Sequence, residues 1–193
     1  MRHKDENKNK SIYKAAIQLV NEQGLSATSM SKIAKRAGIS ASTIYVYFEN
    51  KEDMLNKLYL MIKKDMSVEV FQHYDDSISV RSSFEYTLRK YLDFILNNKD
   101  EFLFIEQFSN SPLLHNLSKE EGTLMFEPII RLLEEGKSQK IFKQVDTNLL
   151  YMAMVNLCMQ YVKEHYGGRI TFKQEDINII VEMTWDAIKK DEI

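Results

Sequence analysis

The chain has 193 residues, of which 44% are hydrophobic and 28% are charged, so it is expected to fold as a globular protein and not to remain disordered. Its two prolines and six glycines are too few for a fold with many tight turns, which favours long helices. A single cysteine excludes an internal disulfide and a cysteine-rich zinc site, and it suits a reducing cytoplasm.

The charged residues are distributed unevenly along the chain. Residues 1–60 hold 10 Lys and Arg against 6 Asp and Glu, whereas residues 61–193 hold 16 against 22. This suggests that only the N-terminal part faces phosphates, although a solvated basic face would give the same pattern. The first ten residues are predicted to form a loosely ordered polar arm without a signal peptide. The longest apolar tract, Leu149–Val162, is shorter than the ~20 residues that cross a bilayer, so we expect a cytoplasmic protein without membrane contact.

Helical spacing of apolar residues predicts a first helix over Ser11–Gln23, which Gly24 ends. Thr28 or Ser29 is expected to cap a second helix, which reaches Ala37.

Gly38 permits a tight turn after this second helix, and Ser40 caps a third helix over Ala41–Phe48. The sequence Asn50–Asp53 then begins a fourth helix that runs towards Phe71.

Capping patterns predict five further helices, which begin near Ser82, Asn98, Ser118, Asp146 and Thr171. Pro128 is expected to kink or restart a helix, Gly136 to end one, and Gly167-Gly168 to end another. The prediction is an all-α fold of about nine helices, without strands or internal repeats.

The third predicted helix has small polar and aromatic residues on its outer side. Ile44 and Phe48 lie four residues apart and can fill a small three-helix core, which leaves the other positions facing outward. Ala41 and Ser42 are small enough to enter a major groove, and Val46 can meet a thymine methyl group. Exposed residues of the second helix could contact the flanking phosphates, namely Ser29, Ser31, Lys32, Lys35 and Arg36. A generic helical hairpin with a polar outer face is the alternative.

Residues 11–58 resemble the N-terminal domain of TetR-family transcriptional regulators. The resemblance lies in the run Thr-Ile-Tyr-Val-Tyr-Phe-Glu-Asn-Lys-Glu-Asp-Met-Leu over residues 43–55, and in Ile33–Ser40 upstream. Carried over by position, it implies DNA contacts by Thr28 or Ser29, Ser40, Ser42, Thr43, Tyr45, Tyr47 and Lys51. Ala41 and Val46 depart from the commoner family pattern, so sequence readout is expected to rely on methyl contacts and DNA shape.

Aromatic and methionine side chains are abundant after residue 60, and they can line an apolar pocket or simply fill a core. The candidate pocket residues are Phe71, Tyr91, Phe94, Phe104, Glu106, Phe108, Phe126 and Met152. Glu106, in a strongly apolar context, and Glu127 would need a partner if buried, so a cationic lipophilic ligand is possible beside acyl-CoA-like and other hydrophobic ones.

The last two helices could form a dimer interface, because in the family they pack against their copies as a four-helix bundle. The candidate interface residues are Met152, Asn156, Met159, Ile177, Ile180, Val181, Thr184 and Ile188. A core within one chain explains the same residues equally well.

The sequence therefore predicts a DNA-binding domain over residues 1–50, linked through the fourth helix to a ligand-binding and dimerisation domain over residues 51–193. The interpretation is a homodimeric repressor that a hydrophobic small molecule releases from a palindromic double-stranded DNA operator. A transcriptional activator, or an interaction module with a non-functional DNA head, are the alternatives. An enzyme is disfavoured and no cofactor or metal is expected, because the histidines lie scattered at positions 3, 73, 115 and 165, and Cys158 lies in an apolar helix.

Overall fold

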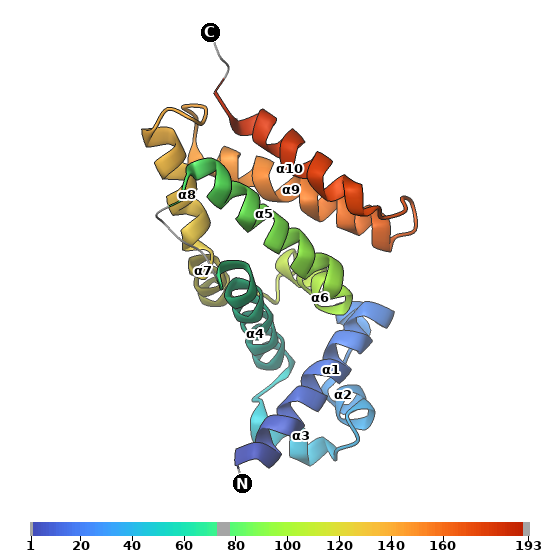
Figure 1. Ribbon diagram of the computed structural model, residues 1–193. Helices are drawn as coiled ribbons and strands as arrows, with labels where there is room; N and C mark the ends of the chain where they lie inside the picture. Colours follow the sequence, from blue (N-terminus) through green and yellow to red (C-terminus); the bar gives the residue numbers. More distant parts are fainter. Residues whose placement is uncertain (1, 73–77, 191–193) are drawn as a thin grey trace. The chain divides into compact units, whose positions relative to one another are not determined.

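The computed structural model describes residues 2–72 and 78–190, with side chains from residue 9 onward. These residues form ten α-helices and, apart from one isolated bridge between Phe142 and Lys189, no β-structure (Figure 1). The helices are α1 (Arg2–Ala27), α2 (Met30–Arg36), α3 (Ala41–Tyr47), α4 (Lys51–Phe71), α5 (Val80–Asn97), α6 (Lys99–Ser109), α7 (Asn116–Leu124), α8 (Glu127–Ser138), α9 (Thr147–Tyr166) and α10 (Gln174–Ile188). The all-α prediction is confirmed, with one helix more than the nine expected.

The chain packs into two compact units. Residues 1–64 and 100–122 form one unit, called the head unit, and residues 65–99 and 123–193 form the other, called the body unit. Helix α4 contributes its residues up to Lys64 to the head unit and its remaining residues to the body unit. The predicted boundary between residues 50 and 51 separates two domains by function, whereas the two units are separated by packing. The packing therefore does not test that boundary, which stays a prediction.

In the head unit, α1 to α4 pack with α6 around one apolar core. The core includes fully buried residues from all five helices, among them Ile12, Ala16, Val20, Ile33, Ile44, Leu55, Leu58, Phe104 and Phe108. The rings of Phe104 and Phe108 stack with centroids 5.4 Å apart, and Tyr59 packs against Phe108 at 6.0 Å. This core fixes the inward faces of α2 and α3 and leaves their other faces to solvent.

The turns of the head unit follow the predicted signals. Gly24 interrupts α1 with φ 82° and ψ 167°, and Gly38 makes the tight turn before α3 with φ 70°. Ser29 caps α2 by accepting a hydrogen bond from Lys32 N, and Ser40 caps α3 by accepting one from Thr43 N. Short polar side chains and glycines therefore place the two short helices.

The predicted disorder of the first ten residues is wrong, because α1 begins at Arg2. This polar stretch holds neither glycine nor proline, and its Lys, Glu and Arg residues are good helix formers, so the helix continues outward from the buried part of α1.

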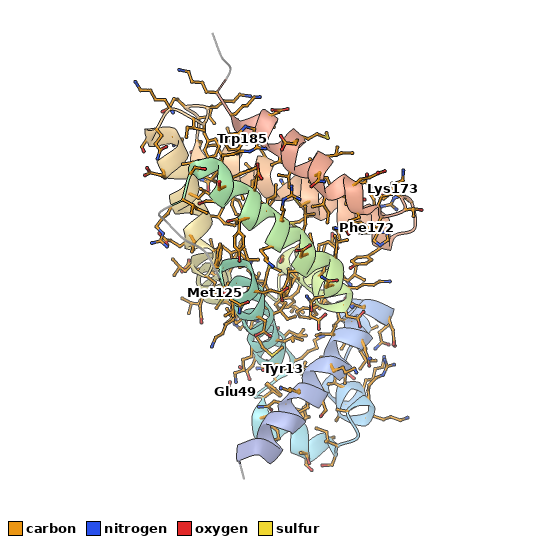
Figure 2. The ribbon with its side chains drawn as sticks, viewed as in Figure 1. Tyr13, Glu49, Met125, Phe172, Lys173 and Trp185 are labelled. Carbon is orange, nitrogen blue, oxygen red and sulfur yellow. The ribbon has the colours of Figure 1, made fainter. Side chains whose placement is uncertain are left out.

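In the body unit, α9 packs against α8, α10 and α5, and α5 also packs against α8 and α10. Three aromatic rings close the end of this unit, since Trp185 of α10 lies 5.2 Å from Phe84 and 5.4 Å from Phe142 between ring centroids (Figure 2 labels Trp185).

Several predicted helix ends differ in the body unit. Helix α5 begins earlier than expected because Ser79, not Ser82, is its cap, and α10 begins at Gln174 without a side-chain cap, so the expected capping box at Thr171 is wrong. Pro128 starts a separate helix as predicted, and Asp146 caps α9. Gly136 does not end α8 but lies within it. No helix of the described part combines the length and apolar character that crossing a bilayer requires.

Candidate nucleic-acid interface

Helix α3 divides into a buried and an exposed side. Ile44 is fully buried and Phe48 is 3% exposed, whereas Val46 is 79% exposed and Tyr45 is 58% exposed. Ala41 and Ser42 are also exposed at the start of the helix, and Thr43 and Tyr47 are partly exposed. An exposed valine and tyrosine on a helix of this length give a surface that can meet both a thymine methyl group and a phosphate.

Three hydroxyl groups gather at the start of α3. The Ser40 hydroxyl lies 2.7 Å from the Thr43 hydroxyl and 2.9 Å from the Ser42 hydroxyl, and it accepts from Thr43 N at 3.1 Å. Because a hydroxyl can rotate and has more than one lone pair, these groups can hold the helix start while still offering hydrogen bonds outward.

Thr28 and Ser29 precede α2 and are the two alternative DNA contacts expected there, and only Ser29 has an accessible side chain. The Thr28 side chain is 2% exposed, and its hydroxyl donates to the carbonyl oxygen of Gly24 at 2.8 Å. The prediction that Thr28 itself could touch DNA is therefore corrected, since its hydroxyl serves the fold. Ser29 is partly exposed at the cap of α2.

The basic side chains of this region differ in their hydrogen-bond and ion-pair partners. The side chain of Lys35 is exposed, and its ammonium makes no hydrogen bond or ion pair with any described residue. Arg36 forms a two-point ion pair with Glu22 at 2.6 and 2.7 Å, which lowers the pKa of that carboxyl. Lys51 donates to the carbonyl oxygens of Leu25 at 3.1 Å and Thr28 at 3.2 Å. Lys35 is thus available to a phosphate, whereas Lys51 already has two acceptors inside the unit.

The residues predicted to line a ligand pocket do not come together in one unit. Phe104 and Phe108 belong to the head core, and Glu106, also in the head unit, is partly exposed. The others belong to the body unit, where Phe71 and Phe126 pack edge to face with centroids 5.9 Å apart. Tyr91 and Phe94 are buried there, whereas Met152 is 43% exposed. Helical spacing does not tell which helices share a core, and two of these aromatic residues, Phe104 and Phe108, fill the core of the head unit.

The residues predicted for the dimer interface divide by helix. On α9, Met152 and Asn156 are exposed and Met159 is partly exposed. The five residues on α10 are all buried within the body unit: Ile177, Ile180, Val181, Thr184 and Ile188. That part of the prediction is wrong, because this apolar stripe faces the neighbouring helices of the same chain. The large apolar residues that α10 exposes are Ile179 and Met183, a pair four residues apart that the sequence reasoning missed.

The described residues hold no group of three or more His, Cys, Asp and Glu side chains that could bind a metal ion. His73 and the side chain of His3 lie outside the described residues. Cys158 is buried, and burial raises the pKa of its thiol to about 12, as for an unreactive core residue.

Family models match both ends of the chain. Residues 12–58 match the model described as bacterial regulatory proteins, tetR family, and residues 84–189 match the one described as tetracyclin repressor-like, C-terminal domain. The chain belongs to the TetR family. The first match assigns α2 and α3 to the DNA-binding domain of a transcriptional regulator, and members of this family act by binding DNA and not as enzymes.

Similar proteins agree with this assignment to the TetR family. A TetR family transcription regulator from Marinobacter aquaeolei has the same fold, with a TM-score of 0.91 at 24% identity over 99% of this chain and 100% of that one. An uncharacterised HTH-type transcriptional regulator from Haemophilus influenzae is 19% identical over 179 residues, which are 93% of this chain and 94% of that protein. The fatty acid metabolism regulator protein of Bacillus subtilis is 48% identical over 48 residues, which are 25% of each chain.

Proposed function

We propose that this TetR-family regulator is a homodimeric repressor that leaves a palindromic operator when a hydrophobic small molecule binds. The observation that carries the proposal is the exposed apolar surface of α9 and α10, here called the α9–α10 face. Its members are Leu149, Met152, Leu157, Ile179 and Met183, each at least 36% exposed.

Exposed apolar side chains gathered on two packed helices favour an interaction surface. Helices α9 and α10 pack against each other, and both carry large apolar side chains that the body unit leaves exposed. A second copy of the chain would cover this face with the same residues, and the two-fold symmetry would space two α3 helices for a palindromic site.

A response to a ligand is supported by an unusual tyrosine in the body unit. Tyr91 is 8% exposed, and its hydroxyl makes no hydrogen bond with any described residue. Burial, with the nearby Tyr151 phenol and Cys158 thiol, raises its pKa well above the ordinary value. A ligand or water that forms a hydrogen bond with this hydroxyl inside the body unit would be favoured there.

The effector is then an apolar molecule with one polar group. The name of the Bacillus subtilis relative, a fatty acid metabolism regulator, supports testing fatty acids and their acyl-CoA thioesters first. Helix α4 offers the route of coupling, because it is a single continuous helix with residues in both units. A ligand that favours one arrangement of α4 would change the spacing of the two α3 helices and so release DNA.

The proposal is tested by selecting duplexes from random sequence with the purified protein. We expect an inverted repeat to be selected, one dimer to bind it, and a fatty acid or acyl-CoA to release it, with lower expression of a reporter placed behind the site. Selection of no duplex, or a monomer at micromolar concentration, would contradict the proposal. Higher reporter expression would identify an activator.

A further inference from the structure

The end of α1 and its connection to α2 accept side-chain hydrogen bonds from one residue of the connection, one of α2 and one of α4. The Thr28 hydroxyl donates to the carbonyl of Gly24, and the Lys51 ammonium donates to the carbonyls of Leu25 and Thr28. The Lys32 ammonium donates to the carbonyl of Ala27 at 2.7 Å. Four of the five carbonyl oxygens from Gly24 to Thr28 therefore accept a side-chain hydrogen bond.

These carbonyls need such partners because Gly24 breaks the hydrogen-bonding pattern of α1. Carbonyls at the end of a helix have no intrahelical donor, and they carry the negative end of its dipole. A lysine ammonium satisfies both needs, since it brings three donors and a positive charge. Lys51 therefore ties the first residue of α4 to the segment that leads into α2.

The first turn of α4 is itself held in place. Asp53 N donates to Asn50 Oδ1 at 2.9 Å, and Glu49 N donates to Asp53 Oδ2 at 3.0 Å (Figure 2 labels Glu49). The same carboxylate oxygen accepts from Lys57 at 2.9 Å. Only residues 48–50 separate this turn from α3, so Lys51 links the segment that follows α3 to the connection that precedes α2.

We infer that Lys51 is a positioning residue for DNA binding and not a phosphate contact. Two of its three ammonium protons are donated to carbonyls of the α1–α2 connection. By fixing α4 to that connection, it holds the Ser29 cap of α2 and the exposed side of α3 in one arrangement. Lys35, exposed and unpaired within the described residues, is the matched lysine whose charge faces outward.

The inference rests on the DNA binding proposed above, and it is tested with Lys51→Gln, Lys35→Gln and wild type on a duplex selected by the wild-type protein. The dissociation constant is measured over a series of salt concentrations, together with the thermal midpoint. A lost phosphate contact lowers the slope of log affinity against log salt by about one. For Lys35→Gln we expect that lower slope with an unchanged thermal midpoint.

For Lys51→Gln we expect the wild-type slope, a lower thermal midpoint and an affinity reduced at least about tenfold at every salt concentration, because charged hydrogen bonds that orient the reading helix are lost. A slope lowered by about one, or an unchanged affinity, would overturn the inference. If the wild-type protein selects no duplex, it is the proposed function that fails.

Because Lys51→Gln could unfold the head unit, Lys51→Arg is the second variant. It keeps the charge, so a phosphate contact would survive at wild-type affinity or better. We expect both the affinity and the thermal midpoint to fall, since a planar guanidinium does not replace a compact ammonium between two carbonyls. Wild-type values of both quantities would overturn the inference.

Discussion

Gly136 lies directly beneath the ring of Phe142. A Cβ atom at Gly136 would stand 2.2 Å from Cδ2 of that ring, which is fully buried against Trp185 and Phe84. The glycine is therefore required by close packing inside α8 and not by a turn at its end.

Gly136→Ala is expected to lower the free energy of unfolding by about 1–3 kcal/mol, although alanine is the better helix former, because the buried ring must shift. Urea denaturation measures the change. Combining it with Phe142→Leu should cost less than the two single changes added together, since leucine leaves room for the methyl group. Strict additivity, or a stabilising Gly136→Ala, would contradict this packing argument.

The exposed side of α3 is expected to be needed for DNA binding and not for stability. Val46 is 79% exposed, so Val46→Glu should leave the thermal midpoint unchanged while placing a negative charge against the phosphates. We expect at least about a tenfold loss of affinity for a selected duplex. Val68→Glu is the matched control, because Val68 is 60% exposed on α4 and outside the proposed interface. Equal affinities of the two variants would argue against α3 as the reading helix.

The head unit could be predicted from the sequence because its signals are local. Ser29, Gly38 and Ser40 each determine a cap or a turn within four residues, and those elements lie where expected. Which apolar residues of α10 are buried and which are exposed could not be predicted in the same way. Ile177 and Ile179 are two residues apart, both apolar, and point to different sides of the helix, so only the positions of α5 and α9 decide which is buried.

The tertiary structure also decides which polar side chains form hydrogen bonds within the protein. Thr28 and Ser29 are equivalent as capping residues in the sequence, yet the positive φ of Gly24 turns the chain so that the Thr28 hydroxyl reaches the carbonyl of Gly24. The interaction of Lys51 with Leu25 spans 26 residues of sequence, and no periodicity signals it.

The dimer proposed through the α9–α10 face should dissociate when its apolar centre becomes charged. Ile179 is 53% exposed, so Ile179→Glu should not affect folding of the monomer, but it would bury an unpaired carboxylate in the dimer. We expect the molar mass from light scattering to halve at micromolar concentration. Leu117→Glu serves as control, since Leu117, on α7, is 79% exposed, belongs to the head unit and is not one of the residues of this face. A variant that stays dimeric would remove the α9–α10 face as the interface.

Stability should rise with pH because of Lys63 in α4. Burial lowers the pKa of this ammonium from 10.5 to about 8. Between these values the unfolded chain binds a proton that the folded chain has released, so the free energy of unfolding increases with pH, whereas below about pH 8 the full cost of burying the charge remains.

Lys63→Met should lack this increase. Urea denaturation at about pH 7.5 and about pH 9.5 is expected to show wild type gaining about 2 kcal/mol relative to Lys63→Met, since each unit of pKa shift corresponds to ~1.4 kcal/mol. Lys64→Met, the exposed neighbour on α4, should follow wild type. Parallel pH profiles for wild type and Lys63→Met would mean that the ammonium of Lys63 is not desolvated in the folded protein.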